Sequence, residues 1–296
     1  MDRPGVGVVV FYLHSVGAHR APTLCSKVNM DKLSKLKANL RALESAVVAF
    51  SGGVDSSFLL RVARDTLPKK SLLAVTAVSD TYTKLELSQA KRFVRLLGVR
   101  HKIIFTDELK DANFRKNPVD RCYYCKKELF GRLKAIASHK RIKNIIDASN
   151  KDDKKDYRPG SMAKEEFGVR SPLQESQITK KDIRRYSKRL GLETWDFPSM
   201  ACLASRVPYG TEIKKDVLEK IEAAEDIIKK AGFRHVRVRY YNDIARIEVE
   251  KKEIKKFLNC KSYDKILKKL KSLGFIYITL DLEGYRTGSL NESIKK

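Results

Sequence analysis

The sequence lacks several features that mark familiar classes of protein. No apolar run approaches the roughly 18 residues of a membrane-spanning helix, so we expect no membrane span. No internal repeat or low-complexity tract is present, which argues against a solenoid or a disordered chain. The five histidines show neither metal-ligand nor catalytic-triad spacing. We therefore assign them no catalytic role.

The N-terminal segment carries little information. Residues 6–13 form a short apolar stretch after Arg3, so a secretory signal peptide is one interpretation, but no small-residue cleavage site follows. The spacing of the later cysteines suits a reducing compartment better than disulfide bonds. We expect a cytoplasmic protein in which residues 1–29 are a non-essential extension and the first helix begins near Asp31.

Length and charge limit the possible architectures and partners. The chain has 296 residues, more than the roughly 100 to 200 of a single core, so two domains are expected. Its 62 Lys and Arg against 36 Asp and Glu give a net charge of +26, which raises a nucleic-acid hypothesis. Because no detached basic tail is present, we favour a lysine-rich solvated surface and do not expect nucleic-acid binding.

From Ala46 onward, short β-rich runs alternate with helical stretches, which is typical of βαβ units and a parallel sheet. We predict strands at 46–50, 72–78, 102–106 and 144–148, with helices between them at 58–67, 84–97 and 123–139. Residues 150–178 are polar and rich in turn formers, so we predict a long functional loop with at most one short helix there. The sequence thus predicts an α/β domain over residues 30–207.

The pattern changes after Gly210. An amphipathic helix is predicted at 212–231, closed by Gly232. Strands at 236–241 and 245–250, a Lys-rich helical stretch to Leu273 and a last strand at 275–282 follow. We predict a small α+β domain over residues 208–296.

A glycine- and serine-rich loop lies between the first predicted strand and its helix. Two glycines allow a sharp turn close to a phosphate, and the free amides and dipole of the helix N-terminus attract an anion. The alternative is an ordinary βα turn with Ser and Asp helix caps. No lysine of the Walker type is present, which disfavours simple γ-phosphoryl transfer. The residues expected to hold a nucleotide are Ser51, Gly52, Gly53, Asp55, Ser56 and Ser57.

This loop resembles the signature Ser-Gly-Gly-x-Asp-Ser of pyrophosphate-loop (PP-loop) ATPases at every fixed position. In that superfamily ATP adenylates a substrate oxygen, pyrophosphate leaves, and a nucleophile then displaces AMP. The resemblance implies ATP and Mg²⁺, with Asp55 as a catalytic residue near the metal or the pyrophosphate. The alternative role of Asp55 is that of an acid favoured by the dipole in the first helical turn.

Five cysteines occur in the chain. The two-residue spacing of Cys122 and Cys125 lets two thiolates at a helix start share a metal. One such pair is half of a site, so a redox dithiol, a structural zinc site and thiols without a chemical role all stay open. Cys25 lies in the N-terminal extension and Cys260 in a Lys-rich segment, and we interpret both as incidental.

Three further segments carry a more specific resemblance: residues 198–210, which include Cys202, residues 156–160 and residues 281–291. Together with the phosphate loop they are similar to the LarE family of ATP-dependent sulfur transferases, over about residues 31 to 292. Members adenylate a carboxylate of pyridinium-3,5-biscarboxylic acid mononucleotide and replace it with a thiocarboxylate, in the biosynthesis of the nickel-pincer nucleotide. The resemblance implies this small acidic nucleotide substrate and self-association into homo-oligomers.

Two sulfur sources are known in that family. In one branch a single cysteine at the position of Cys202 gives up its own sulfur. In the other, three cysteines hold a [4Fe-4S] cluster that carries an extra sulfide. The resemblance places Cys122, Cys125 and Cys202 in the three-cysteine branch as metal ligands, with Cys202 also catalytic.

An acidic substrate needs cationic partners. Strand alternation places Arg237 and Arg239 on one face, where both guanidinium groups can meet one phosphate. They resemble the substrate-phosphate arginines of the family, and Arg206 and Glu225 also match family substrate-binding positions. The alternative is a half-exposed strand with a solvated charged face.

Other functions stay open from the sequence. A tRNA thiolase of the PP-loop superfamily is consistent with the positive charge, although we recognise no RNA-binding motif. A non-catalytic ATP or iron-sulfur sensor is a second alternative. An amide-forming PP-loop synthetase is a third, but it needs no cysteine pair.

Overall fold

The computed structural model describes residues 31–155, 159–198, 200–286 and 288–294. The predicted extension at residues 1–29, with Cys25, and residues 156–158 of one family-like segment lie outside the described residues. Residues Asp31–Lys296 form one compact unit.

A four-stranded parallel sheet forms the first part of this unit. Its strands are β1 (Ala46–Ala49), β2 (Leu72–Val78), β3 (Arg100–Phe105) and β4 (Asn144–Ile146). The strand order is β3-β2-β1-β4, and all three pairings are parallel. The four predicted strands and the α/β class are confirmed.

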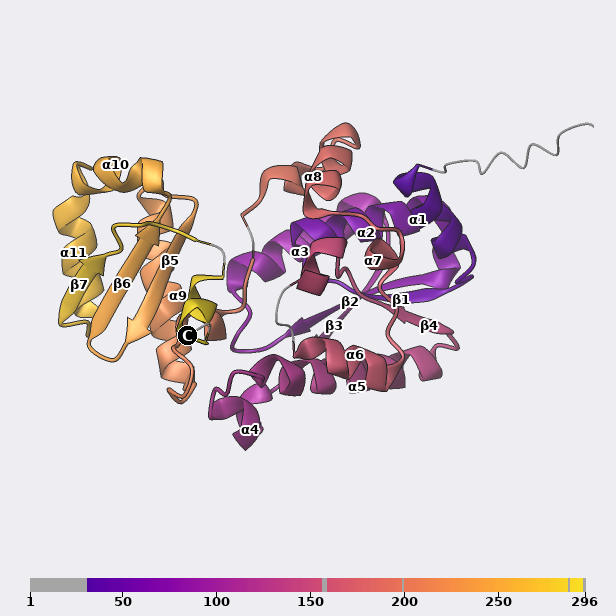
Figure 1. Cartoon of the computed structure of the whole chain (residues 1–296), viewed down its shortest axis with the longest axis horizontal. Coiled ribbons are helices and arrows are strands. Elements are labelled where there is room, and N and C mark those ends of the chain that lie inside the picture. The colour runs from indigo at the N-terminus through magenta and orange to yellow at the C-terminus, as the bar shows by residue number, and fades with distance from the viewer. Residues whose placement is uncertain (1–30, 156–158, 199, 287, 295–296) are drawn as a thin grey trace, which may run out of the picture. The chain divides into compact units, whose positions relative to one another are not determined.

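Helices cover both faces of this sheet (Figure 1). One face carries α1 (Lys32–Arg41), α2 (Val54–Thr66), α3 (Lys84–Leu97) and α8 (Lys180–Arg189), and the other carries α5 (Arg121–His139) and α6 (Gly160–Phe167). Successive β1 residues alternate between the two faces, since Val48 packs into the α2 side and Val47 into the α5 side. A sheet buried on both faces requires the apolar strands that the sequence contains.

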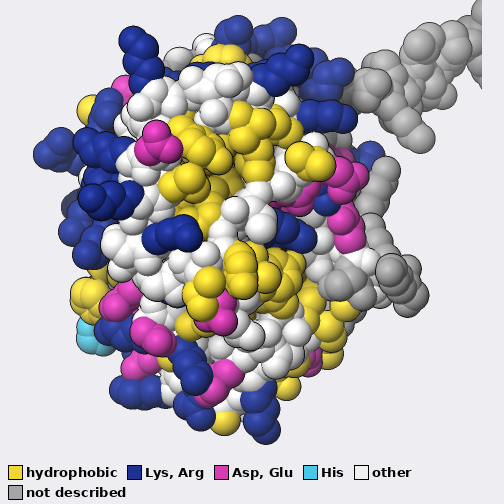
Figure 2. Space-filling model, turned by 90° about the vertical axis from the view of Figure 1, so that its left-hand side faces the viewer, with side chains coloured by type: hydrophobic (Ala, Val, Ile, Leu, Met, Phe, Trp, Pro, Cys, Tyr) yellow, Lys and Arg dark blue, Asp and Glu magenta, His cyan; other side chains and the backbone are white. Residues whose placement is uncertain are grey.

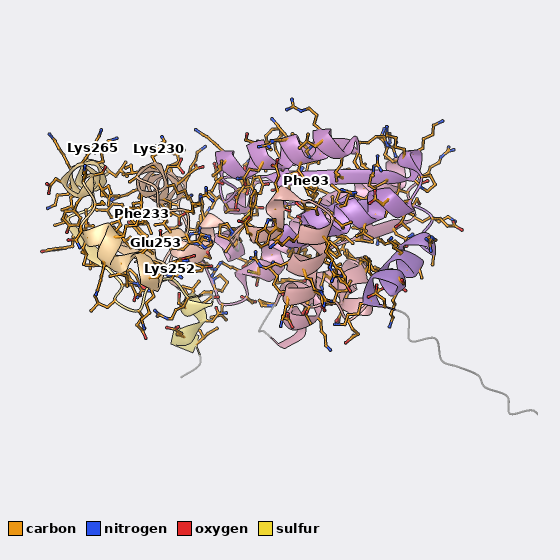
Figure 3. The ribbon with its side chains drawn as sticks, turned by 90° about the horizontal axis from the view of Figure 1, so that it is seen from above. Phe93, Lys230, Phe233, Lys252, Glu253 and Lys265 are labelled. Atoms are coloured by element: carbon orange, nitrogen blue, oxygen red, sulfur yellow. The ribbon has the colours of Figure 1, made fainter. Side chains whose placement is uncertain are left out.

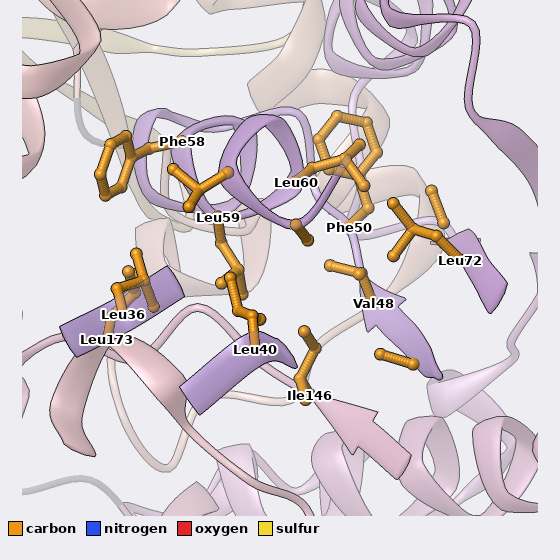
Figure 4. Packing of buried hydrophobic residues seen from close by; sticks show 14 of the residues in the cluster. Leu36, Leu40, Val48, Phe50, Phe58, Leu59, Leu60, Leu72, Ile146 and Leu173 are labelled. Carbon is orange, nitrogen blue, oxygen red and sulfur yellow. The ribbon is translucent and has the colours of Figure 1, made fainter. Parts of the chain in front are cut away.

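Leucine is the commonest residue in the core on the α2 side. Figure 4 shows Leu59 and Leu60 of α2 near Leu40 of α1 and Val48 of β1. All four side chains are fully buried. This packing fixes the start of α2, and therefore the phosphate loop, relative to the sheet.

The prediction of a long loop over residues 150–178 is wrong. This region contains η3 (Lys151–Lys155), α6, and α7 (Pro172–Glu175). Its Ala163 is fully buried against the α5 side of the sheet, and Gly168 closes α6 in the left-handed conformation. The polar composition reflects the outer face of helices that bury few residues.

The second part of the unit has its own sheet and core. It contains α9 (Lys215–Lys230), β5 (Val236–Tyr241), β6 (Ile244–Val249), α10 (Ile254–Leu258), α11 (Tyr263–Ser272) and β7 (Tyr277–Leu280). The strand order is β5-β6-β7, with an antiparallel and then a parallel pairing. Phe233 lies in this core, away from Phe93 of the first part (Figure 3). The boundary at residues 207 and 208 stays a prediction.

Short helices complete the described chain. They are α4 (Ala112–Arg115), η1 (Lys69–Ser71), η2 (Glu108–Lys110), η4 (Glu193–Asp196), η5 (Leu203–Arg206), η6 (Lys251–Glu253) and η7 (Ser289–Ile294). Within the ranges described above, no helix is long and apolar enough to cross a membrane. Figure 2 shows one face on which Lys and Arg lie mainly along the margin and apolar side chains gather toward the middle.

Candidate functional site

The phosphate loop lies at the point in the parallel sheet where the order of successive strands changes direction. The loop follows β1, which pairs with β2 on one side and with β4 on the other. In open parallel sheets, ligands bind beyond the carboxyl ends of the strands at this switch point. The sheet topology therefore favours a ligand between the loops after β1 and β4.

The geometry of the loop suits a phosphate. Gly52 has φ of 76°, and a Cβ there would lie 3.1 Å from the Cβ of Ala90, so only glycine fits without strain. Gly53 caps α2 without a side-chain hydrogen bond. The Ser56 hydroxyl donates to Gly53 O at 3.2 Å and lies 3.1 Å from the Ser51 hydroxyl. Small, polar groups and a helix N-terminus thus meet at one point.

Asp55 is held from two distant segments. Lys180 Nζ, at the start of α8, lies 2.5 Å from its carboxylate, and Asn150 Nδ2, after β4, donates to it at 3.3 Å. Sequence reasoning missed both partners. The Thr179–Asp182 capping box was the signal for a helix start at Lys180. Lys180 brings to the loop the positive charge that a Walker lysine supplies elsewhere.

The Cys202 segment is tied to the phosphate loop through the loop after β2. Leu203 N donates to Thr81 O at 3.0 Å, and the Tyr82 hydroxyl donates to Ser51 O at 2.8 Å. Met200 Sδ lies 3.7 Å from the position that a Cβ on Gly53 would take. The predicted sulfur site and the predicted nucleotide site are therefore neighbours.

Arg206 fixes the Cys202 segment to α9. Its guanidinium group donates to the two carboxylate oxygens of Glu225 at 2.8 and 3.2 Å, and to Ala201 O and Cys202 O at 2.6 and 3.1 Å. Arg206 and Glu225 are 3% and 1% exposed. Burial alone would raise the pKa of Glu225, but the charge and hydrogen bonds of Arg206 outweigh it and hold that pKa at about 2. These two predicted substrate residues thus pair with each other.

The three candidate ligand cysteines lie close enough to act electrostatically on one another. Cys122 and Cys125 are in the first turns of α5, and Cys202 precedes η5. Burial, and then the charge of Glu108, raises the pKa of the Cys125 thiol well above its ordinary value, and Cys122 and Cys202 contribute to the rise. Burial, and then Cys122, raises the pKa of Cys202. Cys202 is nevertheless solvent-accessible, as expected for a thiol in a recess.

Glu108 is a further buried acid beside this group. Cys125 Sγ lies 3.7 Å from its Oε1, and its Oε2 has no hydrogen-bond partner among the described residues. In that same part of the chain, no group of three or more His, Cys, Asp and Glu side chains is arranged to hold a metal ion. Three thiols with a carboxylate nearby are nonetheless the donor chemistry that suits iron-sulfur or zinc binding.

A cavity of about 960 Å³ opens beside the cysteines. It is lined by Cys122, by Ala201 and Ser205 of the Cys202 segment, and by Arg237 and Arg239. Another part of its wall is a polar network of Asp147, Ser149, Lys164 and Ser171. A basic cavity with an accessible thiol at its edge can bind an anionic ligand and present sulfur to it.

The two β5 arginines share a face, as predicted, while Val236 and Val238 are fully buried in the core. Arg239 contacts Glu248 at 2.5 and 3.1 Å and donates to Ser205 O at 2.9 Å. The Arg237 guanidinium lies 5.3 Å from the centre of the Tyr285 ring. Arg237 and Arg239 are 8% and 6% exposed, so the alternative of a half-exposed solvated strand face is wrong.

These features define a class: a parallel-sheet nucleotide-binding protein with a PP-loop beside a basic, cysteine-bearing cavity. Residues 28–150 match the NAD synthase family model. The chain is 39% identical to pyridinium-3,5-bisthiocarboxylic acid mononucleotide synthase of Lactiplantibacillus plantarum, over 90% of this chain and 95% of the relative. It therefore belongs to the LarE family within the PP-loop superfamily.

Two other relatives have similar lengths. An uncharacterized protein of Synechocystis is 40% identical over 90% of this chain and 99% of its own length. An uncharacterized protein of Methanocaldococcus jannaschii is 33% identical over 88% of this chain and 99% of its own. The similarity thus spans both sheets of the described unit.

Proposed function

We propose that the chain is an ATP-dependent sulfur transferase that adenylates a carboxylate of pyridinium-3,5-biscarboxylic acid mononucleotide and converts it to a thiocarboxylate. The observation that carries this proposal is the cavity that Cys122, Ala201, Ser205, Arg237 and Arg239 line together. The name of the Lactiplantibacillus relative and its 39% identity support the substrate class. A product of this kind belongs to nickel-pincer nucleotide biosynthesis.

Activation takes place at the phosphate loop. The amides at the start of α2 bind phosphate oxygens of ATP, and Lys180 offsets their charge. Mg²⁺ takes carboxylate and phosphate oxygens as ligands, and Asp55 is the carboxylate in place to bind it. A substrate carboxylate oxygen attacks the α-phosphorus of ATP, the bond to the β-phosphate breaks, and pyrophosphate leaves.

The substrate lies in the basic cavity. Arg237 and Arg239 bind its phosphate, because planar guanidinium groups match phosphate oxygens in pairs. Arg206 and Glu225 keep the Cys202 segment against α9 at a fixed position. They are therefore positioning residues for the thiol, and Ser205 completes the wall between the thiol and Arg239.

Sulfur enters at Cys202. Either this thiol attacks the acyl adenylate, displaces AMP and later loses its Cβ–S bond, or the sulfur is a separate sulfide. In the second case Cys122, Cys125 and Cys202 would hold a [4Fe-4S] cluster, and the chemistry that such a cluster would supply is a bound sulfide. The three-thiol donor set favours the second source. A cytoplasmic location and self-association are further proposals that follow from the family.

Pyrophosphate release tests the activation step. We expect release when purified protein receives ATP and the dicarboxylate mononucleotide. Release should stay at background with ATP alone, and with a pyridinium mononucleotide whose ring bears a carboxamide and no carboxylate. Equal release in all three samples, or none in the first, contradicts the proposal.

A further inference from the structure

The first residue of α5, Arg121, stands out in the wall of the 960 Å³ cavity. It directly precedes Cys122 and is 3% exposed. We propose that Arg121 binds the second ring carboxylate of the ligand, the one that is not reacting, and so sets specificity for a dicarboxylate. This inference rests on the proposed function, because it assumes that the same cavity takes the substrate.

The proposal is based on how the buried arginines are paired with acidic residues. Arg206 and Arg239 are buried against Glu225 and Glu248. Arg121, by contrast, forms no ion pair with any acidic residue that the structure describes, and its Nε is buried without a hydrogen-bond partner there. A buried cation without a counter-charge is unfavourable. A ligand anion removes this penalty.

The guanidinium group of Arg121 is held in place before any ligand arrives. Nη1 donates to Asn117 Oδ1 at 3.0 Å, and the Tyr209 ring lies 4.6 Å away on one face. Asn117 is fully buried, and its amide nitrogen donates to the carbonyls of Val207, Pro208 and Thr211 at 3.3, 2.7 and 3.0 Å. This network fixes which amide atom faces Arg121. A fixed guanidinium group loses little entropy on binding, so its contact with an anion is strong.

The position of Arg121 favours a carboxylate over the phosphate. Arg237 and Arg239 come from β5, whereas Arg121 comes from the helix that carries Cys122. Arg121 and Cys122 line the cavity together with Ala201, the residue directly before Cys202. The reacting carboxylate must reach Cys202, and the second carboxylate is on the same small ring. A cation on the cysteine side of the cavity is therefore placed for that second group.

Binding of two ligands to three proteins tests this role. The ligands are pyridinium-3,5-dicarboxylate mononucleotide and the matching mononucleotide with one ring carboxylate, titrated calorimetrically without ATP. The proteins are wild type, Arg121→Met and Arg237→Ala. We expect wild type to prefer the dicarboxylate by about ten- to a hundredfold. Arg121→Met should lose this preference with little change for the monocarboxylate, whereas Arg237→Ala should weaken both ligands alike.

Thermal unfolding of ligand-free protein supplies a second readout. Because Arg121→Met removes an unpaired buried charge, its melting temperature should match or exceed that of wild type. A residue with a purely structural role gives a lower one. If Arg121→Met fails to fold, Arg121→Gln retains a donor for Asn117 and replaces it in the titrations.

The outcomes separate the inference from the proposed function. If wild type binds neither nucleotide, the proposed function and this inference are both contradicted. If wild type binds both without preference, or if the Arg121 variant weakens both alike, only the assignment of Arg121 is overturned.

Discussion

Asp55 and Lys180 meet across 125 positions of the sequence, with Nζ and carboxylate oxygen 2.5 Å apart. Because Asp55 is placed to bind Mg²⁺ at the phosphates, Asp55→Asn should lower pyrophosphate release by about a hundredfold or more. The ion pair is partly solvated, because the Lys180 side chain is 32% exposed and the Asp55 side chain is 23% exposed. The free energy of unfolding should therefore fall by only about 1 kcal/mol.

Asp65 provides a matched control on the same helix. It pairs with Arg61 at 2.7 Å, near the opposite end of α2 from the phosphate loop. Asp65→Asn should keep wild-type pyrophosphate release, measured in the same coupled assay. A folded Asp55→Asn protein as active as the Asp65→Asn protein would remove Asp55 from the site.

Ionisation of Glu225 makes the stability of the protein depend on pH. Its pKa of about 2 in the folded protein is below its ordinary value of 4.5. The contribution of its pair with Arg206 to stability is therefore complete above about pH 4.5 and is lost as pH falls toward 2. Glu225→Gln should lower the free energy of unfolding by about 3 to 5 kcal/mol at neutral pH, because Arg206 then stays buried without a charged partner.

Urea unfolding at a series of pH values measures this difference. Between pH 4.5 and 2, wild type should lose up to about 3 kcal/mol more than Glu225→Gln, so the two proteins converge in acid. Parallel stability curves over that range would show that Glu225 does not stay ionised in the folded protein.

The residues of the site were partly predictable from the sequence. Some features depend only on residues close together in the sequence, so they can be recognised before the fold is known. These are the phosphate loop, the paired cysteines and the alternation of Arg237 and Arg239. The partners Lys180 and Asn150 were not predictable, because side chains far apart in sequence meet only once the strand order is known. The roles of the predicted site residues stay predictions.

At the scale of elements, the phosphate loop depends on the close approach of α3. Gly52 and Gly191 both have positive φ, 76° and 65°, but only Gly52 has neighbours within 4 Å of an added Cβ. Gly191→Ala should therefore lower the free energy of unfolding by about 1 kcal/mol, through the positive φ alone. Gly52→Ala should cost more, because the backbone of Ala90 lies 3.2 Å from the new atom.

The two variants also separate stability from binding. ATP affinity should fall in Gly52→Ala and stay unchanged in Gly191→Ala, as fluorescence titration with a labelled ATP analogue measures. Equal stability and equal affinity for the two variants would contradict the close packing of the loop on α3.

The regular elements were largely predictable, and the exceptions share one cause. Strands β1 and β2 are apolar runs, and α3 shows a clear helical period. No helix was predicted at α8, and α6 was predicted only as one possible short helix within a long loop, because both helices bury few apolar residues. Their helical state depends on packing against α5 and α2, which sequence periodicity does not reveal.

At the scale of the whole molecule, the Cys202 segment connects parts of the chain that are far apart in sequence. The phosphate loop belongs to the parallel sheet, whereas Arg237 and Arg239 belong to the second sheet, and the Cys202 segment contacts both. The net charge of +26 is compatible with an anionic ligand, but it neither requires one nor locates a site for it. The cavity is lined by Arg237 and Arg239 together with Ala201 and Ser205 of the Cys202 segment.

Mass spectrometry of one anaerobic reaction tests the central claim most directly, because nucleotide and polypeptide are weighed in the same sample. With ATP, the dicarboxylate should gain the mass of an oxygen-to-sulfur exchange. Cys202→Ala should still release pyrophosphate but yield no sulfur-containing nucleotide. An unchanged polypeptide mass supports a cluster-bound sulfide, whereas loss of H₂S from Cys202 makes that cysteine the donor and overturns the cluster proposal. A wild-type sample that releases pyrophosphate but leaves the nucleotide without sulfur would contradict sulfur transfer itself.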